Sequence, residues 1–396
     1  MPEISPYTRR AIEYIRYLSE EIGGRGSCTS KVRQALDYIA NHLQASGVKQ
    51  VNFELFTGTT STYRPYALAF GSALLGTVVF WLIGGQRILI AVAILSGLAA
   101  WGMIAETDFT PNWLRWMLPT AKTHNLVGIL LPTGEIQHRA VLCAHVDTHR
   151  TPVIYSSSTW HRLFSLLVTL AFASLTVNIL AYGLSALFYW QGVRWLGLVT
   201  GLVQLLALML CLQAEFTPFS PGANDNASGV GTVLGLVQRL TEEPLQNTEL
   251  WVLFTDCEEV GAYGIGAFMD LHAEALGAET LYIVLDEVGI GGVEYLIRDG
   301  LILKRNTHPR AIVIARQATA ALPNLAIAEQ VGMAYTDGTA VTRRGLPALH
   351  INTIDRSSSP QHHWHQMSDR LETLDLQALE NTHRFAWQVL QVVDAG

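Results

Sequence analysis

Two long apolar blocks constrain the fold of this chain more than any other feature. Residues 66–105 contain a single charged residue, Arg87, and residues 163–214 contain a single one, Arg194. Each block is long enough for two helices of about 20 residues, the length that crosses the hydrocarbon core of a bilayer. Each arginine lies near a natural break, so we expect two transmembrane hairpins. The four predicted spans are roughly 66–84, 88–105, 163–189 and 195–214.

The alternative is that these blocks form helices of a soluble core. Core helices are usually shorter or keep a polar face. The whole chain is also apolar, with 15% charged residues against about 25% in an average soluble domain and a mean hydropathy of +0.25. We expect Asn178, inside the third span, to face another helix because a lone amide in lipid is costly. A lipid bilayer is therefore a predicted partner.

Charge and cysteine usage exclude two further classes. The net charge of −7 gives no basic surface, so we expect no nucleic-acid partner. The cysteines show no CxxC spacing, so we expect buried free thiols rather than a disulfide framework. They are Cys28, Cys143, Cys211 and Cys257.

Outside the two blocks, helical and strand patterns alternate along the chain. The expected helices are 6–22, 29–46, 262–276 and 375–393, and the expected strands are 51–56, 125–130, 140–146, 249–255, 281–286 and 347–352. This alternation predicts an α/β fold of three layers, with a mixed, mostly parallel sheet covered by helices on both faces. We expect residues 1–65, 106–162 and 215–396 to form one discontinuous domain, with hairpins 66–105 and 163–214 inserted in its loops.

Polar side chains follow the expected strands where each strand ends. His145 and Asp147 share one face after the strand 140–146. His145 could bind a metal while Asp147 holds its other ring nitrogen, although a plain hydrogen-bonded pair explains them equally well. Asp225 lies in the turn GANDNASG before a helix, where capping is the alternative role.

The pair Glu258 and Glu259 ends another apolar strand. Two adjacent carboxylates repel and are costly to bury unless a cation compensates them. Asp286 ends the strand 281–286, and the segment HHWHQMSD offers His362, His363 and His365. The carboxyl ends of strands in an open α/β sheet form its usual ligand crevice. These oxygen and nitrogen ligands, with one spare glutamate, suit two adjacent divalent cations.

The same motifs resemble those of the two-zinc exopeptidases of metallopeptidase family 28, which include leucyl aminopeptidases and glutamate carboxypeptidase. The resemblance covers nearly all the non-membrane segments, and GANDNASGV is its most specific match. The other matching motifs are AHVD, DCEEVGAYG, VLDEVG, WHQMSD and TDGTAVTRRGLPALHI.

The resemblance implies a role for each matching residue. His145 and Asp286 would bind one zinc, Glu259 and His365 the other, and Asp225 would bridge both. Glu258 would be the general base on a metal-bridging water, with Asp147 as a further catalytic residue. His365 is preferred over its neighbouring histidines because Asp369 follows four residues later. Trp364 and Asp337 are the expected substrate-binding residues. Two Zn²⁺ are the expected cofactors, and Co²⁺ or Mn²⁺ would also accept these ligands.

The chain departs from the family pattern at two places. Trp364 stands where many relatives carry a tyrosine that donates to the oxyanion, and an indole N–H can donate but not accept. The 80 residues between His145 and Asp225 are explained by the second hairpin.

The implied function is a membrane-anchored zinc aminopeptidase that acts on peptide substrates. The alternatives are a single-zinc glutaminyl cyclase-like transferase and a non-catalytic membrane receptor or scaffold on the same fold. A transporter is disfavoured because the spans contain almost no ionisable groups. A cytoplasmic position for the catalytic domain is expected from the basic residues near the span ends, against one arginine in each hairpin turn.

Overall fold

The computed structural model describes residues 4–188, 190, 192–332, 334–355 and 363–396 of the chain. These residues form two compact units. The sheet unit comprises Met1–Thr60, Thr120–His149 and Phe219–Gly396, and the helical unit comprises Ser61–Pro119 and Arg150–Pro218. Each unit is therefore built from segments that are distant in the sequence.

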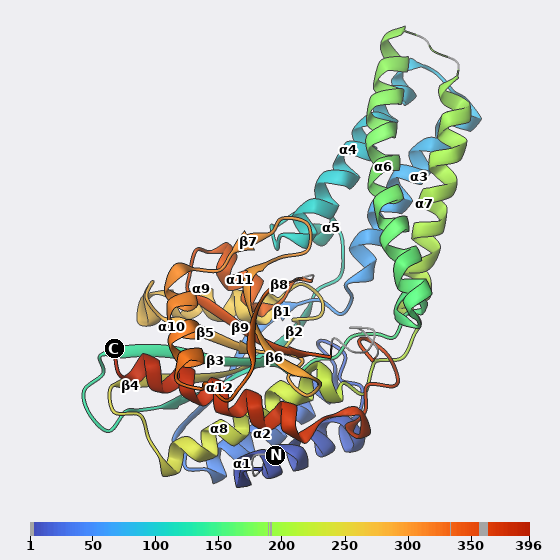
Figure 1. Ribbon diagram of the computed structural model, residues 1–396. Helices are drawn as coiled ribbons and strands as arrows, with labels where there is room; N and C mark the ends of the chain where they lie inside the picture. Colours follow the sequence, from blue (N-terminus) through green and yellow to red (C-terminus); the bar gives the residue numbers. More distant parts are fainter. Residues whose placement is uncertain (1–3, 189, 191, 333, 356–362) are drawn as a thin grey trace. The chain divides into compact units, whose positions relative to one another are not determined.

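The strands of the sheet unit form one mixed sheet in the described part of the chain (Figure 1). They are β1 (Gln50–Gly58), β2 (Ala121–Leu130), β3 (His138–His145), β4 (Thr248–Thr255), β5 (Leu281–Leu285), β6 (Gly292–Asp299), β7 (Arg305–Asn306), β8 (Ile327–Val331) and β9 (Ala348–Ile354). Their order is β1-β2-β4-β3-β5-β9-β6-β7, with β8 paired to β6. The parallel strands β4, β3, β5 and β9 lie in the centre, and antiparallel pairs flank them.

Helices cover both faces of this sheet, which confirms the expected α/β architecture (Figure 1). One face carries α1 (Pro6–Arg16), α2 (Ser30–Ala45), α8 (Gly229–Glu242) and α12 (Leu376–Asp394), with α10 (Pro309–Ala320) packed on α12. The other face carries α9 (Tyr263–Leu276) and α11 (Asp337–Arg343). The β-branched and leucine side chains of β3, β4 and β5 are buried between these layers, and they form the core with α1, α2, α8 and α12.

The sequence patterns missed several elements toward one edge of the sheet. Strand β8, with the sequence IAEQV, contains few β-branched residues and is only partly buried, so it has no clear alternation. The expected first helix also ends earlier: α1 stops at Arg16, and Tyr17–Ile22 form a wider π-helical turn.

The helical unit contains four long apolar helices. They are α3 (Tyr63–Ile83), α4 (Gln86–Thr107), α6 (Ser158–Phe188) and α7 (Val193–Glu215), and a single turn, α5 (Trp113–Trp116), accompanies them. All four are long and apolar enough to cross a membrane. They pack as α3 on α4 and α7, and α6 on α4 and α7.

Small and polar side chains lie inside this bundle. Asn178 is fully buried, and its Oδ1 accepts a hydrogen bond of 2.7 Å from the Thr200 hydroxyl on the neighbouring helix. Asn178 thus faces another helix, as the sequence predicts. Gln204 is also fully buried, whereas leucines such as Leu202 project outward.

Candidate metal centre

The sheet topology brings the candidate ligands to one edge. Strand β3 pairs in parallel with both β4 and β5, so the carboxyl ends of all three strands lie at the same edge. His145 is the last residue of β3, Glu258 and Glu259 follow β4, and Asp286 follows β5. Their side chains are buried although they are polar, which requires compensating partners.

Asp225 lies between two histidines from distant segments. Its Oδ1 is 3.3 Å from Nε2 of His145, and its Oδ2 is 3.2 Å from Nε2 of His365. Nε2 of His145 is also 3.2 Å from Oδ1 of Asp286. Burial opposes ionisation of Asp225, but the hydrogen bonds from His145 and His365 outweigh it and lower the pKa of this carboxyl. Each oxygen of Asp225 therefore faces a separate group of ligands.

The ring of His145 is oriented by the residue two positions later. Its Nδ1 is 3.0 Å from the backbone oxygen of Asp147 and 3.6 Å from the Asp147 carboxylate. Asp147 thus holds the other ring nitrogen of His145, as the sequence predicts, and its main-chain oxygen is the nearer partner. A fixed Nδ1 leaves Nε2 directed at Asp225 and Asp286.

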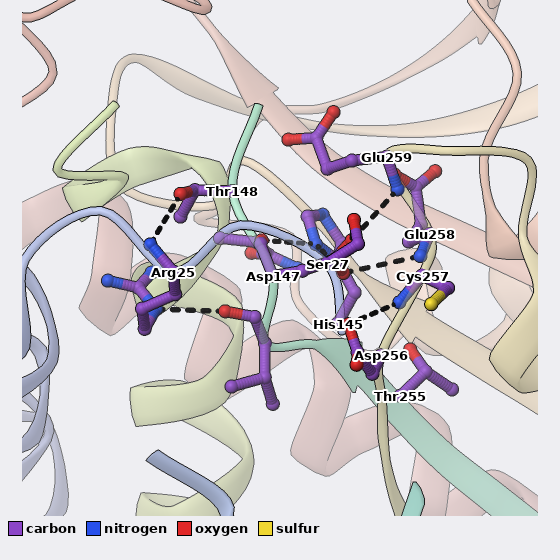
Figure 2. A network of polar contacts seen from close by, with 12 residues as sticks. Arg25, Ser27, His145, Asp147, Thr148, Thr255, Asp256, Cys257, Glu258 and Glu259 are labelled. Carbon is purple, nitrogen blue, oxygen red and sulfur yellow. Dashed lines mark hydrogen bonds and ion pairs between the residues drawn. The ribbon is translucent and has the colours of Figure 1, made fainter. Parts of the chain in front are cut away.

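The carboxylate of Asp147 binds the loop that carries the two glutamates (Figure 2). It accepts hydrogen bonds from the backbone N–H groups of Glu258 (3.2 Å) and Glu259 (3.3 Å). The hydroxyl of Ser27 donates to the same carboxylate at 2.6 Å. The side chain of Asp147 therefore positions Glu258 and Glu259 by binding their backbone N–H groups.

Glu258 is enclosed in the site. Burial raises the pKa of its carboxyl well above the usual value; His145 opposes this shift, whereas the carboxylates of Asp286 and Asp337 add to it. One ligand atom of each of His145, Glu258 and Glu259 lies within 4.8 Å of the others. A carboxyl group whose proton affinity is raised in this way is suited to accept and release a proton.

A second group of ligands contains a residue that the sequence reasoning missed. This group consists of His149, Glu259 and His365. Each residue offers one ligand atom, and the three atoms lie within 4.8 Å of one another. The rings of His149 and His365 stack, with centroids 3.7 Å apart and planes 13° apart. The spacing of His145 and His149 in HVDTH was the available signal, but the segment after β3 is not a helix, so no regular pattern placed both at the site.

The backbone around Asp225 is held by a carboxylate from the C-terminal part of the chain. Asp369 accepts hydrogen bonds from the backbone N–H groups of Asn224 (2.7 Å) and Asp225 (3.1 Å). This contact gives a physical reason for the spacing between His365 and Asp369. Of the neighbouring histidines, His363 contacts the Ser368 hydroxyl at 3.0 Å, and His362 lies outside the described residues.

A buried arginine binds the backbone of the segments that lead to Asp147 and Asp225. The guanidinium of Arg25 donates to the backbone oxygen of Val146 (2.8 Å), directly before Asp147, and to that of Gly222 (3.0 Å), three residues before Asp225. It also donates to the oxygens of Leu18, Gly23 and Pro221. Burial lowers the pKa of Arg25 to about 10, against the opposing effect of nearby carboxylates, and the side chain stays charged at neutral pH. Nothing in the segment IGGRGS indicates a buried arginine, so the sequence patterns do not predict the role of Arg25.

The two expected substrate-binding residues have different environments. Trp364 is partly buried and stacks on His365, with ring centroids 4.1 Å apart. Asp337 begins α11, is 1% exposed, and accepts a hydrogen bond of 2.6 Å from the Thr255 hydroxyl. Substrate contact stays a prediction for both residues.

The donor set fits divalent cations. Among the described residues, Oε1 of Glu259 is buried and accepts no hydrogen bond, although an orphaned carboxylate oxygen is costly. Oxygen and imidazole ligands converge around it and around Asp225, and neither group contains a thiol. Zinc accepts such ligands.

Sequence comparison identifies a family for part of the chain. Residues 212–390 match the model of Peptidase family M28. The matched region contains Asp225, Glu258, Glu259, Asp286 and His365, but His145 precedes it. No curated protein matches the chain.

Solved structures resemble the chain over almost its whole length. A zinc-dependent exopeptidase from Parabacteroides distasonis has a TM-score of 0.56 and 14% identity, with 98% of each chain covered. A zinc aminopeptidase from Bacillus subtilis has a TM-score of 0.57 and 15% identity, covering 98% of this chain and 95% of that one. A glutaminyl cyclase from Porphyromonas gingivalis has a TM-score of 0.55 and 14% identity, with 97% of each chain covered.

At these identities, the solved structures establish the fold alone, and the match of residues 212–390 adds the family motifs. The chain resembles the zinc exopeptidases of peptidase family M28.

Proposed function

We propose that this protein is a membrane-anchored zinc aminopeptidase that removes N-terminal residues from peptides. The observation that carries the proposal is the placement of Asp225, whose two oxygens face His145 and His365 at 3.3 and 3.2 Å. One carboxylate between two imidazoles is the arrangement needed to bridge two cations. The family match over residues 212–390 supports the same chemistry.

The ligands divide into two sets around Asp225. His145 and Asp286 would hold one zinc ion, and Glu259 and His365 the other. We add His149 to the second set because its ring lies against His365 and its ligand atom reaches Glu259. When bound, the two cations would lower the pKa of a water molecule and polarise the scissile carbonyl.

The chain's own residues supply the proton transfer and its geometry. Glu258 accepts a proton from the attacking water and delivers it to the leaving amine. Asp147 keeps Glu258 and Glu259 in place through their backbone N–H groups. Trp364, beside His365, offers an indole N–H to the substrate, and Asp337 is the second proposed substrate-binding residue. The free amino end of the peptide would bind close to one cation, and this contact would restrict the enzyme to exopeptidase activity.

The helical unit would anchor the protein in a bilayer. Large apolar side chains project outward from all four long helices, whereas Asn178, Thr200 and Gln204 are buried between them. A distribution with apolar side chains outside and polar side chains between the helices suits a bundle that is surrounded by lipid. The basic residues flanking the spans favour a cytoplasmic sheet unit; they are Arg64, Arg115, Lys122, Arg150 and Arg162.

A hydrolysis assay on the detergent-purified full chain tests the proposal. A panel of aminoacyl-p-nitroanilides is offered to the wild-type protein, to Glu258→Gln, and to chelated protein before and after zinc is restored. We expect activity that is lost in the variant and on chelation, and that returns with zinc. Cyclisation of N-terminal glutamine without p-nitroanilide hydrolysis would instead assign a glutaminyl cyclase-like transferase.

A further inference from the structure

A pair of thiols beside the metal centre takes no part in the proposed chemistry. The Sγ atoms of Cys28 and Cys257 lie 3.2 Å apart, although 229 positions separate them in the sequence. Cys257 is fully buried and Cys28 is partly exposed. Cys257 directly precedes Glu258, and Cys28 directly follows Ser27, which donates to Asp147. Each thiol therefore stands next to a residue of the candidate site.

One carboxylate holds the backbones of both cysteines. Asp256 accepts a hydrogen bond from the N–H of Cys28 at 3.0 Å through Oδ2 and from the N–H of Cys257 at 2.6 Å through Oδ1. The hydroxyl of Thr123 donates to the same carboxylate at 2.5 Å. The side chain of Asp256 thus fixes the distance between the backbones of Cys28 and Cys257.

The space around the two sulfur atoms is confined. A Cβ atom at Gly58, the last residue of β1, would lie 2.5 Å from Sγ of Cys257 and 3.3 Å from Sγ of Cys28. Both cysteines also have positive φ angles, 62° and 64°, which residues with a Cβ rarely adopt. Both cysteines therefore have a disfavoured backbone conformation, and only a glycine fits at position 58. Together these features allow the two thiols to be in contact.

A metal ion explains this cluster less well than a bond between the sulfurs. Thiophilic metals such as zinc take about four ligands in structural sites. Both oxygens of Asp256 already accept N–H or O–H donors. Both thiols are also directed at the backbone oxygen of Thr59, at 3.4 Å for Cys28 and 3.7 Å for Cys257. The third side chain close enough to share a metal with the two thiols is that of Asp256, and its oxygens are already engaged by these N–H and O–H donors. The contact between the two thiols therefore favours oxidation of the pair.

We propose that Cys28 and Cys257 are a modification site that forms a reversible disulfide by exchange with a small disulfide such as oxidised glutathione. The thiolate of Cys28, the more exposed sulfur, attacks one sulfur of the small disulfide and releases one thiol. Cys257 then attacks the Cys28 sulfur of the mixed disulfide and releases the second thiol. The protein pair loses two electrons and two protons, and the small disulfide gains them.

The bond would join the segment Arg25–Cys28 to the loop 256–259. Those two segments already share Asp147, which accepts hydrogen bonds from Ser27 on one side and from Glu258 and Glu259 on the other. The cross-link closes a long loop in the unfolded chain, which stabilises the folded state of the sheet unit. The proposal does not depend on peptidase activity.

The experiment uses the full-length protein in detergent. The protein is equilibrated with mixtures of oxidised and reduced glutathione, unreacted thiols are alkylated under denaturing conditions, and the peptides are analysed by mass spectrometry. We expect a Cys28–Cys257 linked peptide that appears with oxidising mixtures and disappears after reduction, while Cys143 and Cys211 are alkylated throughout. The oxidised wild type should also unfold at a temperature roughly 5–10 °C higher than the reduced form.

Matched variants separate the proposed bond from other effects of oxidation. Cys28→Ser should remove the rise in unfolding temperature, whereas Cys211→Ser, in α7, should retain it. If Cys28 and Cys257 stay alkylated at every glutathione ratio, the proposal is overturned. A persistent mixed disulfide at Cys28, or tight binding of Cd²⁺ by both thiols in place of the bond, would also overturn it.

Discussion

In the sheet unit, the large apolar side chains of β3, β4 and β5 are buried, and the candidate ligands gather where these strands end. In the helical unit, leucines such as Leu202 face outward, and Asn178 and Gln204 are buried. Each unit gives one of its buried polar side chains specific partners: Asp147 receives two backbone N–H groups and a hydroxyl, and Asn178 receives the hydroxyl of Thr200. The contrast agrees with the proposed lipid surround of the helical unit, and Asp147 illustrates that a buried charge needs an organised set of partners.

The largest expected effect comes from a substitution in the sheet unit that abolishes the proposed general base and preserves the packing around it. Glu258→Gln keeps the shape of the side chain but abolishes its capacity as a base. We expect peptide hydrolysis to fall by about 10²–10⁴-fold, measured as kcat/KM, with zinc content and unfolding temperature retained. Asp270→Asn, at an exposed position of α9, is the matched control and should leave kcat/KM unchanged. Full activity in Glu258→Gln would contradict the assignment.

The second prediction tests whether buried charge supports the sheet unit. Arg25→Met leaves the backbone oxygens of Val146, Gly222 and Pro221 without their donor. We expect a loss of about 3–5 kcal/mol in the free energy of unfolding. The measurement is denaturant unfolding of the full chain, with Arg33→Met on the exposed face of α2 as the control. Equal stability of both variants would show that the buried guanidinium is dispensable.

The third prediction compares two leucines of similar exposure in the two units. Leu55, on β1, is 63% exposed, and Leu202, on α7, is 59% exposed. In water, Leu55→Lys should change stability by less than about 0.5 kcal/mol. In lipid, Leu202→Lys should disfavour membrane insertion by about 2.5–3.5 kcal/mol. Fractionation of cells between membrane and soluble pools measures the difference, and similar behaviour of the two variants would argue against a lipid surround.

The smallest expected effect lies inside the bundle. Asn178→Val removes the acceptor of the Thr200 hydroxyl, but that hydroxyl also lies 3.2 Å from the backbone oxygen of Leu196. We therefore expect a loss of only about 0.5–1 kcal/mol in bundle stability, as is common for hydrogen bonds between membrane helices. Unfolding of the purified protein in mixed detergent measures it, and a loss above about 2 kcal/mol would indicate a polar network that extends beyond this pair.

The strongly patterned parts of the fold could be predicted from the sequence. The four apolar helices and the strands β3, β4 and β5 were expected within a few residues, because continuous apolar runs and strand-end polar residues leave few alternatives. Strands β6 and β8 and helices α10 and α11 were missed. Strand β8 and helix α10 are only partly buried, β6 has a glutamate among its buried residues, and α11, with seven residues, is too short for a clear period.

The candidate site shows a similar division. His145, Asp225, Glu259, Asp286 and His365 were named from motifs, and the structure brings them together. Arg25 and His149 were missed because their positions depend on tertiary contacts between segments that are distant in the sequence. The main-chain contact of His145 with Asp147 could not be read from an alternating pattern, which concerns side chains alone.

The most direct test of the account is the metal content of the purified full-length protein. Wild type and Asp225→Asn would be dialysed against limiting zinc and analysed by elemental mass spectrometry. The account predicts two zinc ions per chain in the wild type and a clear loss in the variant, because Asp225 lies between both ligand sets. A folded wild-type protein that binds no zinc would contradict the account.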